Sequence, residues 1–235
     1  MQRKIFPPSI RKKRNSKLPL PDFGYEKNLW KKGFSAIGGI DEVGRGSFAG
    51  PVVAGCVVFS KKLSDLKAIK NSGVVINDSK KLTPGAREKA DKWIRENALT
   101  WGIGEASVSA INRLGIKKAT ETAFRRAIKY ADKKGTDIDF LLIDAFYIPY
   151  VKGLRRKNQK AIIKGDAKSI SIAAASIIAK VYRDKLMVKL SKDRKYKKYG
   201  WEKNKGYGTK DHREAIKTYG TTKLHRRDFV RGVVK

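Results

Sequence analysis

Four acidic side chains in this sequence follow apolar runs that are typical of buried strands. Asp41 and Glu42 come after GGI, Asp144 after FLLI, and Asp166 after AIIKG. Carboxylates at the end of a buried strand lose part of their water, and several of them close together repel one another unless a cation lies among them. Sites built only from oxygen ligands select hard cations such as Mg²⁺ or Mn²⁺. The four acids therefore predict a metal site, and two ions about 4 Å apart could hold a phosphodiester for in-line attack by water.

Each acid taken alone has an ordinary structural explanation. Asp41 and Glu42 could open a turn, and Asp144 could cap the next element. Asp166 could lie at the N-cap of a helix, a common position for aspartate. The metal interpretation is favoured because all four occur in a strongly basic chain, where acids on a surface facing nucleic acid are explained by a metal that bridges them to phosphate.

The chain is basic throughout its length. It has 235 residues, with 55 Lys and Arg against 22 Asp and Glu, and a net charge of +33. The first 35 residues hold ten basic and two acidic residues, which leaves 45 basic and 20 acidic residues in the body of the chain. A body with this excess indicates a polyanionic partner, most commonly nucleic acid. General solubility is the alternative explanation of the charge.

Other features of the composition exclude several classes of protein. The single cysteine, Cys56, excludes a disulfide within the chain and a cysteine-based zinc site, and it suits a reducing compartment. No stretch approaches the roughly 20 apolar residues of a membrane span, and no apolar signal core follows the basic N-terminus. With only His212 and His225, a histidine-based nucleophile triad has few candidates, and no P-loop motif occurs. We expect a cytoplasmic protein that does not contact membranes.

The pattern of residues predicts two parts. Residues 1–35 carry four of the seven prolines and the cluster RKKR at 11–14, and predict a basic, flexible N-terminal extension. Residues 36–235 predict a single catalytic domain. We expect the extension to add non-specific affinity for nucleic acid, so that its removal flattens the salt dependence of binding.

Strands and helices alternate along the predicted domain. Strands are predicted at 36–43, 51–59, 101–109, 139–146 and within AIIKGDAKSI. Helices are predicted after the N-cap Thr83 with Pro84, over 111–135 with Gly135 as its cap, over 171–190, and near 212–219. Two adjacent strands followed by crossover helices predict an α/β fold, with a mixed central sheet flanked by helices.

A glycine-rich loop directly follows the paired acids. Its residues Gly44, Arg45 and Gly46 could read a ligand, because glycines let the backbone approach closely and arginine can meet a phosphate with two hydrogen bonds. Backbone groups held in this way could also sense a ribose 2′-hydroxyl, the group that distinguishes RNA from DNA.

Five motifs together resemble a known family. IDEVGRGSFAGPVVAG, NDSKKLTP, LLIDA, KGDAKSISIAAASIIAKVYRDKLM and NKGYGTKDH occur in the order and spacing of the ribonuclease HII (type 2 ribonuclease H) family, over about residues 36–230. The resemblance implies a ribonuclease H-like fold. It also implies an endonuclease that cuts the RNA strand of RNA/DNA hybrids and cuts 5′ of single ribonucleotides in duplex DNA. We expect the protein to be a monomer that binds these nucleic acids. The products would carry 3′-hydroxyl and 5′-phosphate ends, and the role would be the removal of ribonucleotides and RNA primers from DNA.

The resemblance also implies roles for individual residues. The four acids that match the catalytic metal ligands, for two Mg²⁺ or Mn²⁺ ions, are Asp41, Glu42, Asp144 and Asp166. The loop that holds the ribonucleotide 2′-hydroxyl and its phosphates matches Gly44, Arg45 and Gly46. Tyr207, in NKGYGT, matches the tyrosine that contacts the 2′-hydroxyl and packs at the RNA–DNA junction.

Four further positions match the family more loosely. Lys80, in DSKKL, resembles a phosphate-contacting lysine. Lys168 and Ser169 lie at a predicted helix start, which suits phosphate binding. Asp184, in YRDKLM, matches a family position inside the long helix and is expected to support the metal ligands or the fold rather than to bind metal itself.

The sequence differs in one place from the similar ribonuclease HIII and in another from the usual sequence of the ribonuclease HII family. The similar ribonuclease HIII typically has Gly-Thr-Gly-Asp where this chain has Gly44-Arg45-Gly46-Ser47, and it carries an extra N-terminal domain, so ribonuclease HII is favoured. The family usually has glycine after the third acid, where this chain has Ala145. Since alanine fits the start of a helix or turn, we expect the metal geometry to be kept.

Two other classes of function remain as alternatives. A non-catalytic nucleic-acid binder would explain the charge equally well, but it would gain nothing from four acids at strand ends. A metal-dependent nuclease for another substrate, such as a junction resolvase, would leave the glycine-rich loop and Tyr207 unexplained. Metal-dependent cleavage distinguishes the first alternative from the ribonuclease.

Overall fold

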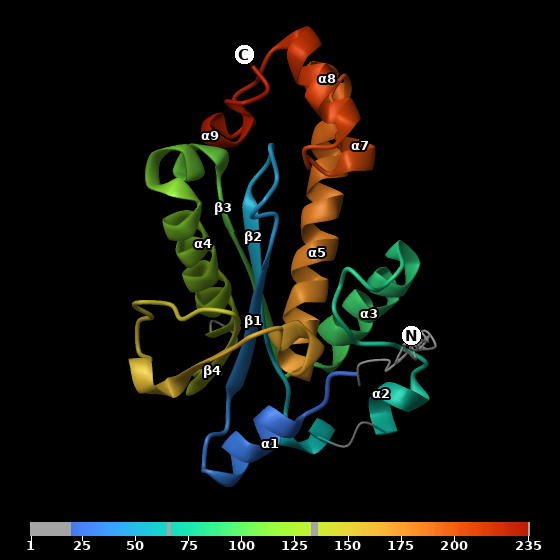
Figure 1. The fold of residues 1–235 in the computed structure, drawn as a ribbon. Coiled ribbons are helices and arrows are strands. Elements are labelled where there is room, and N and C mark those ends of the chain that lie inside the picture. Colours follow the sequence, from blue (N-terminus) through green and yellow to red (C-terminus); the bar gives the residue numbers. More distant parts are fainter. Residues whose placement is uncertain (1–19, 65–66, 133–135, 235) are drawn as a thin grey trace, which may run out of the picture.

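A five-stranded mixed sheet forms the centre of the molecule (Figure 1). The computed structural model describes residues 20–64, 67–132 and 136–234. In spatial order the strands are β3 (Thr100–Ala106), β2 (Val52–Val58), β1 (Ile37–Val43), β4 (Phe140–Asp144) and β5 (Gln159–Ile162). Strand β1 pairs antiparallel with β2 and parallel with β4, so the predicted mixed sheet is confirmed.

The helices follow the predicted order, with short ones added at both ends. They are α1 (Gly24–Lys31), α2 (Lys67–Asn71), α3 (Pro84–Asn97), α4 (Val108–Asp132), α5 (Ile170–Ser191), α6 (Arg194–Lys197), α7 (Trp201–Asn204), α8 (Lys210–Tyr219) and α9 (Arg227–Val230), with 3₁₀ turns η1 (Lys61–Ser64), η2 (Arg156–Asn158) and η3 (Gly165–Ala167). Thr83 caps α3 as predicted, because its hydroxyl accepts a hydrogen bond from the Ala86 backbone amide at 3.3 Å.

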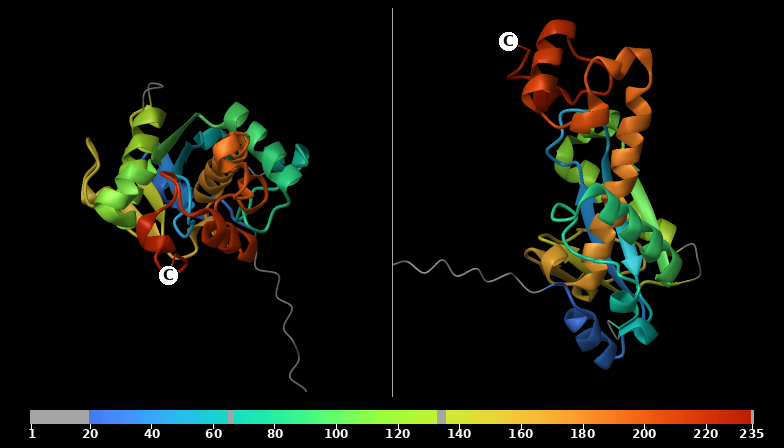
Figure 2. Two further views of the ribbon diagram at one scale, coloured as in Figure 1. Left: turned by 90° about the horizontal axis from the view of Figure 1, so that it is seen from above. Right: turned by 90° about the vertical axis from the view of Figure 1, so that its right-hand side faces the viewer.

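Helices cover both faces of the sheet. Helix α4 lies on one face, and α5 with α3 lies on the other (Figure 1). Ile40 and Phe124 belong to the apolar cluster under α4, whereas Ile37 and Ile177 belong to the cluster under α5. The helices α7 to α9 form a small lobe beyond the end of β1 and β2, next to the loop that joins them (Figures 1 and 2). The two buried faces explain why the central strands lack polar alternation.

Helix α5 approaches the sheet closely at two glycines. A Cβ atom on Gly39 would lie 2.1 Å from the Ser171 backbone, and one on Gly55 would lie 2.3 Å from the Ala175 carbonyl oxygen. Both distances are far inside van der Waals contact, so only glycine permits this helix–sheet spacing. Because Gly55 is the partner of Asp41 in the antiparallel ladder, the backbone of α5 passes directly beside that acid.

The long helix α4 differs from its prediction. It begins at Val108, earlier than the predicted residue 111, and Gly115 interrupts it with φ 77° and ψ 160°. These are not helical angles, and glycine adopts them without steric cost. Gly135, predicted to cap the helix, lies outside the described residues.

The described part of the predicted N-terminal extension packs on the domain. Phe23, Leu29 and Trp30 of the α1 region are buried, and the buried Glu26 accepts hydrogen bonds from the Ser169 hydroxyl at 2.6 Å and the Ser171 amide at 3.1 Å. The packed part of the chain therefore begins before Ala36, and a truncation that tests the extension should keep residues 20–35.

Within the described residues, no helix is both long enough and apolar enough to cross a membrane.

Substituting Gly39 with alanine should destabilise the domain by about 3 kcal/mol or more, because the added methyl group must displace the backbone of α5. Gly85→Ala is the matched control, since Gly85 lies in α3 and a Cβ there meets nothing within 4 Å. Chemical denaturation measures both. Equal stability of the two variants would contradict the close approach of α5.

Candidate active site

Two of the predicted acids lie side by side on neighbouring strands. In the parallel pairing of β1 with β4, Ile40 is opposite Ile143, so the next residues, Asp41 and Asp144, are neighbours across a strand spacing of about 5 Å. Since Ile40 and Ile143 face α4, the alternation of side chains points both acids toward α5. Asp41 is buried and Asp144 is half-buried.

The turn η3 brings a third acid to the same place. Asp166 lies in η3, between β5 and α5, and is half-buried. The backbone amide of Gly165, its neighbour, donates a hydrogen bond to the Asp144 carboxylate at 2.7 Å. The strand and the turn are thus joined directly, and Asp166 is positioned by the end of β4.

The acids act on one another electrostatically. Burial raises the pKa of Asp41 well above its usual value, and the negative charges of Glu42 and Asp144 raise it further. Burial also raises the pKa of Glu42, an effect that Arg45 opposes and Asp144 reinforces. The pKa of Asp166 is raised by burial, by Asp78 and by Asp144. The structure therefore brings the four predicted acids into one cluster of mutually repelling carboxylates.

The composition of this cluster fits a hard divalent cation, but the carboxylates do not converge on one point. Among the described residues, no three carboxylate, imidazole or thiolate groups meet in an arrangement that could hold a metal ion. Each carboxylate has another partner: Glu42 accepts from Arg45 at 3.2 Å, and Asp41 accepts from the Glu42 amide at 2.7 Å. A bound cation would have to replace such partners, and the mutual repulsion favours that exchange.

A fifth acid, Asp78, belongs to the cluster and was missed in the sequence. Its carboxylate accepts a hydrogen bond from the Lys80 amide at 2.9 Å, and the side chain of Lys80 lowers the pKa of Asp166 while Asp78 raises it. The neighbouring Ser79 hydroxyl lies 2.9 Å from that of Ser176 on α5, and Ser176 hydrogen-bonds Asp41. The sequence signal was the turn in NDSKKL, where an aspartate accepts from the amide two residues later.

The Gly44-Arg45-Gly46 loop borders the acids. Arg45 is exposed, pairs with Glu42 at 3.2 Å and lies 5.1 Å from the centre of the Phe146 ring. Gly46 is exposed, and a Cβ there would meet nothing within 4 Å, so its backbone is open to a ligand. Gly44 has φ 88°, and a Cβ there would lie 2.2 Å from the Arg183 Nε, so glycine is required by both the backbone and the contact.

Two wholly buried arginines hold this loop. Arg183, on α5, donates to the carbonyl oxygens of Pro51, Ala49 and Lys205 at 2.9 to 3.0 Å. Arg226 donates to those of Gly50 and Arg45 at 2.8 to 3.0 Å. Each planar guanidinium satisfies several buried carbonyls at once, which a lysine could not do. The arginines join the loop to α5 and to the C-terminal lobe.

Tyr207 lies on the neighbouring loop. The carbonyl oxygen of Gly206 accepts from the amides of Phe48 and Ala49 at 2.8 and 3.1 Å, which joins the Tyr207 loop to the loop after the paired acids. The ring of Tyr207 is half-buried, with the guanidinium of Arg183 5.4 Å and the ammonium of Lys180 5.6 Å from its centre.

A chain of buried hydrogen bonds fixes the backbone of Tyr207. The Thr222 amide donates to Nδ1 of His225 at 2.9 Å, so the proton of His225 is on Nε2 and points to Nε2 of His212 at 3.2 Å. Nδ1 of His212 then carries its proton and donates to the Tyr207 carbonyl oxygen at 2.9 Å. Both histidines must be neutral for this chain to form, and sequence inspection gave no sign of it.

Comparison with known proteins agrees with this arrangement. The sequence model of the family described as "Ribonuclease HII" matches residues 38–233. The chain belongs to the ribonuclease HII family. Its similar relatives include ribonuclease HII of Caldanaerobacter subterraneus subsp. tengcongensis, 44% identical over 90% of this chain and 80% of the relative. Ribonuclease HII of Clostridioides difficile is 46% identical over 89% of this chain and 76% of the relative.

Solved structures share the fold. Ribonuclease H2 from Pyrococcus horikoshii OT3 is 25% identical, with a TM-score of 0.65 over 84% of this chain and 96% of that one. Ribonuclease HII of Archaeoglobus fulgidus, solved in complex with PCNA, is 26% identical, with a TM-score of 0.62 over 81% and 93%. Bst-RNase HIII, solved with Mn²⁺, is 20% identical, with a TM-score of 0.67 over 85% and 69%, and supports the fold alone.

Ribonuclease HII enzymes are metal-dependent ribonucleases H, which cut the RNA strand of RNA/DNA hybrids. The predicted family, fold class and enzymatic nature of the chain are thereby confirmed. The predicted preference for ribonuclease HII over ribonuclease HIII agrees with the family match.

Two of the loosely matched residues, Ser169 and Asp184, are engaged elsewhere, whereas Lys168 is open to solvent. Ser169 is fully buried, caps α5 by accepting from the Ile172 amide at 3.3 Å and donates to Glu26, so its hydroxyl is not available to a phosphate. Lys168, beside it, is exposed. Asp184 pairs with Lys180 at 2.8 Å, two turns along α5 from Ser176, and lies outside the acid cluster.

The expectation for Ala145 is wrong about its backbone. Ala145 has φ 63°, in the left-handed region where alanine costs about 1 to 2 kcal/mol more than glycine. The strain is confined to a tight turn, in which the Phe146 amide donates to the Asp144 carbonyl oxygen at 2.8 Å and the Ala145 amide donates to that of Ile162 at 3.0 Å. These bonds hold Asp144 at the strand end despite the alanine.

Acid should weaken the fold through the buried histidines. Burial lowers the pKa of His212, and burial together with the charge of His212 lowers that of His225 to about 4, whereas an unfolded histidine titrates near 6.5. The unfolded chain therefore binds more protons between these values, and the free energy of unfolding should fall as the pH falls from about 6.5 to about 4. The raised pKa values of the acids act in the opposite direction.

The variant His225→Gln isolates the contribution of the buried histidine to the loss of stability in acid, because the acids contribute equally to the variant and to the natural protein. Between pH 6 and 4.5 the loss of stability per pH unit should be smaller in the variant by up to about 1.4 kcal/mol, the value of one proton. Urea denaturation across this range measures the slopes. Identical slopes would show that His225 is not held neutral.

Proposed function

We propose that this enzyme also cuts duplex DNA on the 5′ side of a single embedded ribonucleotide, with two metal ions held by Asp41, Glu42, Asp144 and Asp166. The observation that supports the proposal most directly is the cluster of mutually repelling carboxylates beside an open glycine-rich loop. Products with 3′-hydroxyl and 5′-phosphate ends would suit the removal of ribonucleotides and RNA primers from DNA.

The four acids would hold the metal ions at the point where the phosphodiester is cut. The bound Mg²⁺ or Mn²⁺ would lower the pKa of the attacking water and stabilise the leaving oxygen. Burial of Asp41 against Ser176 keeps its side chain in one orientation and limits its contact with bulk water. Lys80 lies close enough to Asp166 to shift its pKa, and could meet a phosphate next to the cut.

The two loops would recognise the ribonucleotide. The exposed backbone at Gly46 can approach a ribose 2′-hydroxyl, and Arg45 can exchange its bond to Glu42 for a phosphate when the carboxylate binds metal. Tyr207 can pack under the next nucleotide, because its ring is only half-buried and its backbone is fixed by His212. Recognition of the junction therefore depends on two loops that Arg183 and Arg226 hold together.

We further propose that the enzyme works as a monomer in the cytoplasm. A net charge of +33 repels a second copy, and the only cysteine is buried in β2, where it needs no oxidising environment. Light scattering after size-exclusion chromatography tests the oligomeric state.

Asp41→Asn should reduce cleavage by more than roughly 100-fold, because the loss of a residue that merely supports a metal ligand already costs about 10- to 100-fold. Binding should stay nearly unchanged. The fold should be as stable as before or more so, because the substitution removes a buried, repelled charge. An end-labelled duplex with one internal ribonucleotide, incubated with Mg²⁺, Mn²⁺ or EDTA, measures cleavage.

Asp91→Asn is the control for this substitution. Asp91 is also buried, but it pairs with Arg95 on α3, away from the cluster. The control should keep its cleavage rate while losing some stability. Full activity of Asp41→Asn would refute the metal-site assignment, and tight binding by the natural chain without any cut in either metal would refute the proposed activity.

Tyr207→Ala should impair cutting at a single embedded ribonucleotide more than cutting within a long RNA/DNA hybrid. One stacking contact is worth about 1 to 3 kcal/mol, on the order of 10- to 100-fold, and a long hybrid offers many equivalent positions. Tyr219→Ala, at an exposed tyrosine on α8, is the control. Steady-state rates on the two substrates give the comparison, and equal losses on both would argue against a role at the junction.

A further inference from the structure

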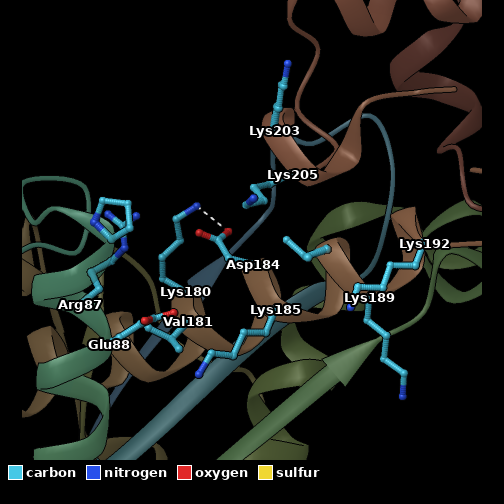
Figure 3. Close-up of a pocket in the computed structure, with 12 residues that line it drawn as sticks. Arg87, Glu88, Lys180, Val181, Asp184, Lys185, Lys189, Lys192, Lys203 and Lys205 are labelled. Atoms are coloured by element: carbon cyan, nitrogen blue, oxygen red, sulfur yellow. Dashed lines mark hydrogen bonds and ion pairs between the residues drawn. The ribbon is translucent and has the colours of Figure 1, made fainter. Parts of the chain in front are cut away.

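A basic groove lies between α3, α5 and α7 (Figure 3), further along α5 than Ser176 and the acid cluster. Its volume is about 610 Å³, and six lysines line it: Lys180, Lys185, Lys189, Lys192, Lys203 and Lys205. The outer part of this groove carries Lys185 and Lys189 on successive turns of α5 and Lys192 at the C-cap of that helix, and the proposed cleavage site does not involve these three lysines.

The charges in the groove are not balanced by its own acids. Its acids are Glu88 and Asp184, and Asp184 is already paired with Lys180 at 2.8 Å. Lys185, Lys189 and Lys192 are exposed and follow one another at intervals of four and three residues, where like charges destabilise a helix by about 0.2 to 0.5 kcal/mol per pair. An arrangement that costs stability without a ligand is explained if a polyanion neutralises it.

The groove continues the site along α5. Ser176, which contacts both Asp41 and Ser79, is one turn before Lys180, and Lys180 lies 5.6 Å from the centre of the Tyr207 ring. Figure 3 shows Lys180 and Asp184 in the middle of the groove, with Arg87 on one side and Lys203 and Lys205 on another. From Lys180 to Lys192 the helix rises about 18 Å, which corresponds to roughly five base pairs of duplex.

We propose that this groove binds the sugar–phosphate backbone of the substrate duplex on one side of the cut. The inference rests on the proposed function, because the substrate must reach the acid cluster. Lysine ammonium groups on flexible stems neutralise phosphates as point charges and read no bases, so the groove adds affinity that does not depend on sequence. A small ligand is disfavoured because the lysines are spread along a line instead of converging on one point.

The test compares two triple variants that remove the same charge. The groove variant is Lys185→Gln with Lys189→Gln and Lys192→Gln. The control is Lys117→Gln with Lys118→Gln and Lys129→Gln, at exposed lysines of α4 on the opposite face of the sheet. Binding of a 30-base-pair duplex with one central ribonucleotide is followed by fluorescence anisotropy in EDTA from 50 to 300 mM salt.

The groove variant should bind at least 10-fold more weakly than the control near 0.1 M salt. The slope of log K against log salt should decrease in magnitude by about 2 to 3, since each phosphate contact contributes about 0.9. In Mg²⁺ its KM should rise while kcat stays the same, because the three lysines are remote from the acids. Slopes and KM values equal to those of the control would overturn the proposal.

Shortening the duplex separates this inference from the proposed function. Cutting the duplex back on one side of the ribonucleotide should raise KM for the natural enzyme, and the groove variant should no longer respond to that truncation. If both proteins cleave and shortening the duplex raises KM equally in both, the inference about the groove is rejected and the proposed function is retained. If binding depends on the groove lysines but no cleavage occurs with Mg²⁺ or Mn²⁺, the proposed function is rejected and the inference about the groove is retained.

Discussion

The contact between helix α5 and the two central strands is the constraint on which the site depends. At Gly39 and Gly55 the backbone of α5 occupies the space that the Cβ atom of any other residue would need. This spacing buries Asp41 against Ser176 and sets the direction of α5, whose following turns carry Lys180, Arg183 and Asp184. Ser176 beside Asp41, the loop anchor Arg183 and the lysines of the basic groove therefore lie along one rigid helix, which packs against the strands that carry Asp41 and Asp144.

The strand register adds the second fixed relationship. Parallel pairing of β1 with β4 makes neighbours of Asp41 and Asp144, which are separated by about 100 residues in the chain. Their proximity raises the energy of the folded chain, because burial and repulsion both disfavour the charged carboxylates. The clustered acids thus lower the free energy of unfolding, as is common at functional sites, and a bound cation would offset this loss.

Basic residues in this chain have two distinct physical roles. Arg183 and Arg226 are buried and satisfy backbone carbonyls, and they position the loops around Gly44 and Tyr207. The exposed lysines of α5 leave their charge to be neutralised from outside. The chemistry of the two side chains accounts for the division, because a planar guanidinium can bridge several fixed acceptors whereas an ammonium group serves as a mobile point charge.

Local patterns in the sequence were enough to predict the four acids, the glycine-rich loop, the mixed sheet and the main helices, because apolar periodicity and turn chemistry act over a few residues. Other features depend on residues that are far apart in the chain. Ser169 is buried because Glu26 reaches it from α1, Asp78 joins the acids because Ser79 meets α5, and Tyr207 is fixed through His212 and His225. The left-handed backbone of Ala145 likewise follows from its bond to Ile162 and not from the preference of alanine. The sequence by itself determined which groups could do the chemistry, and the tertiary structure decided which of them remain available, since burial and hydrogen bonding are settled only when distant segments pack.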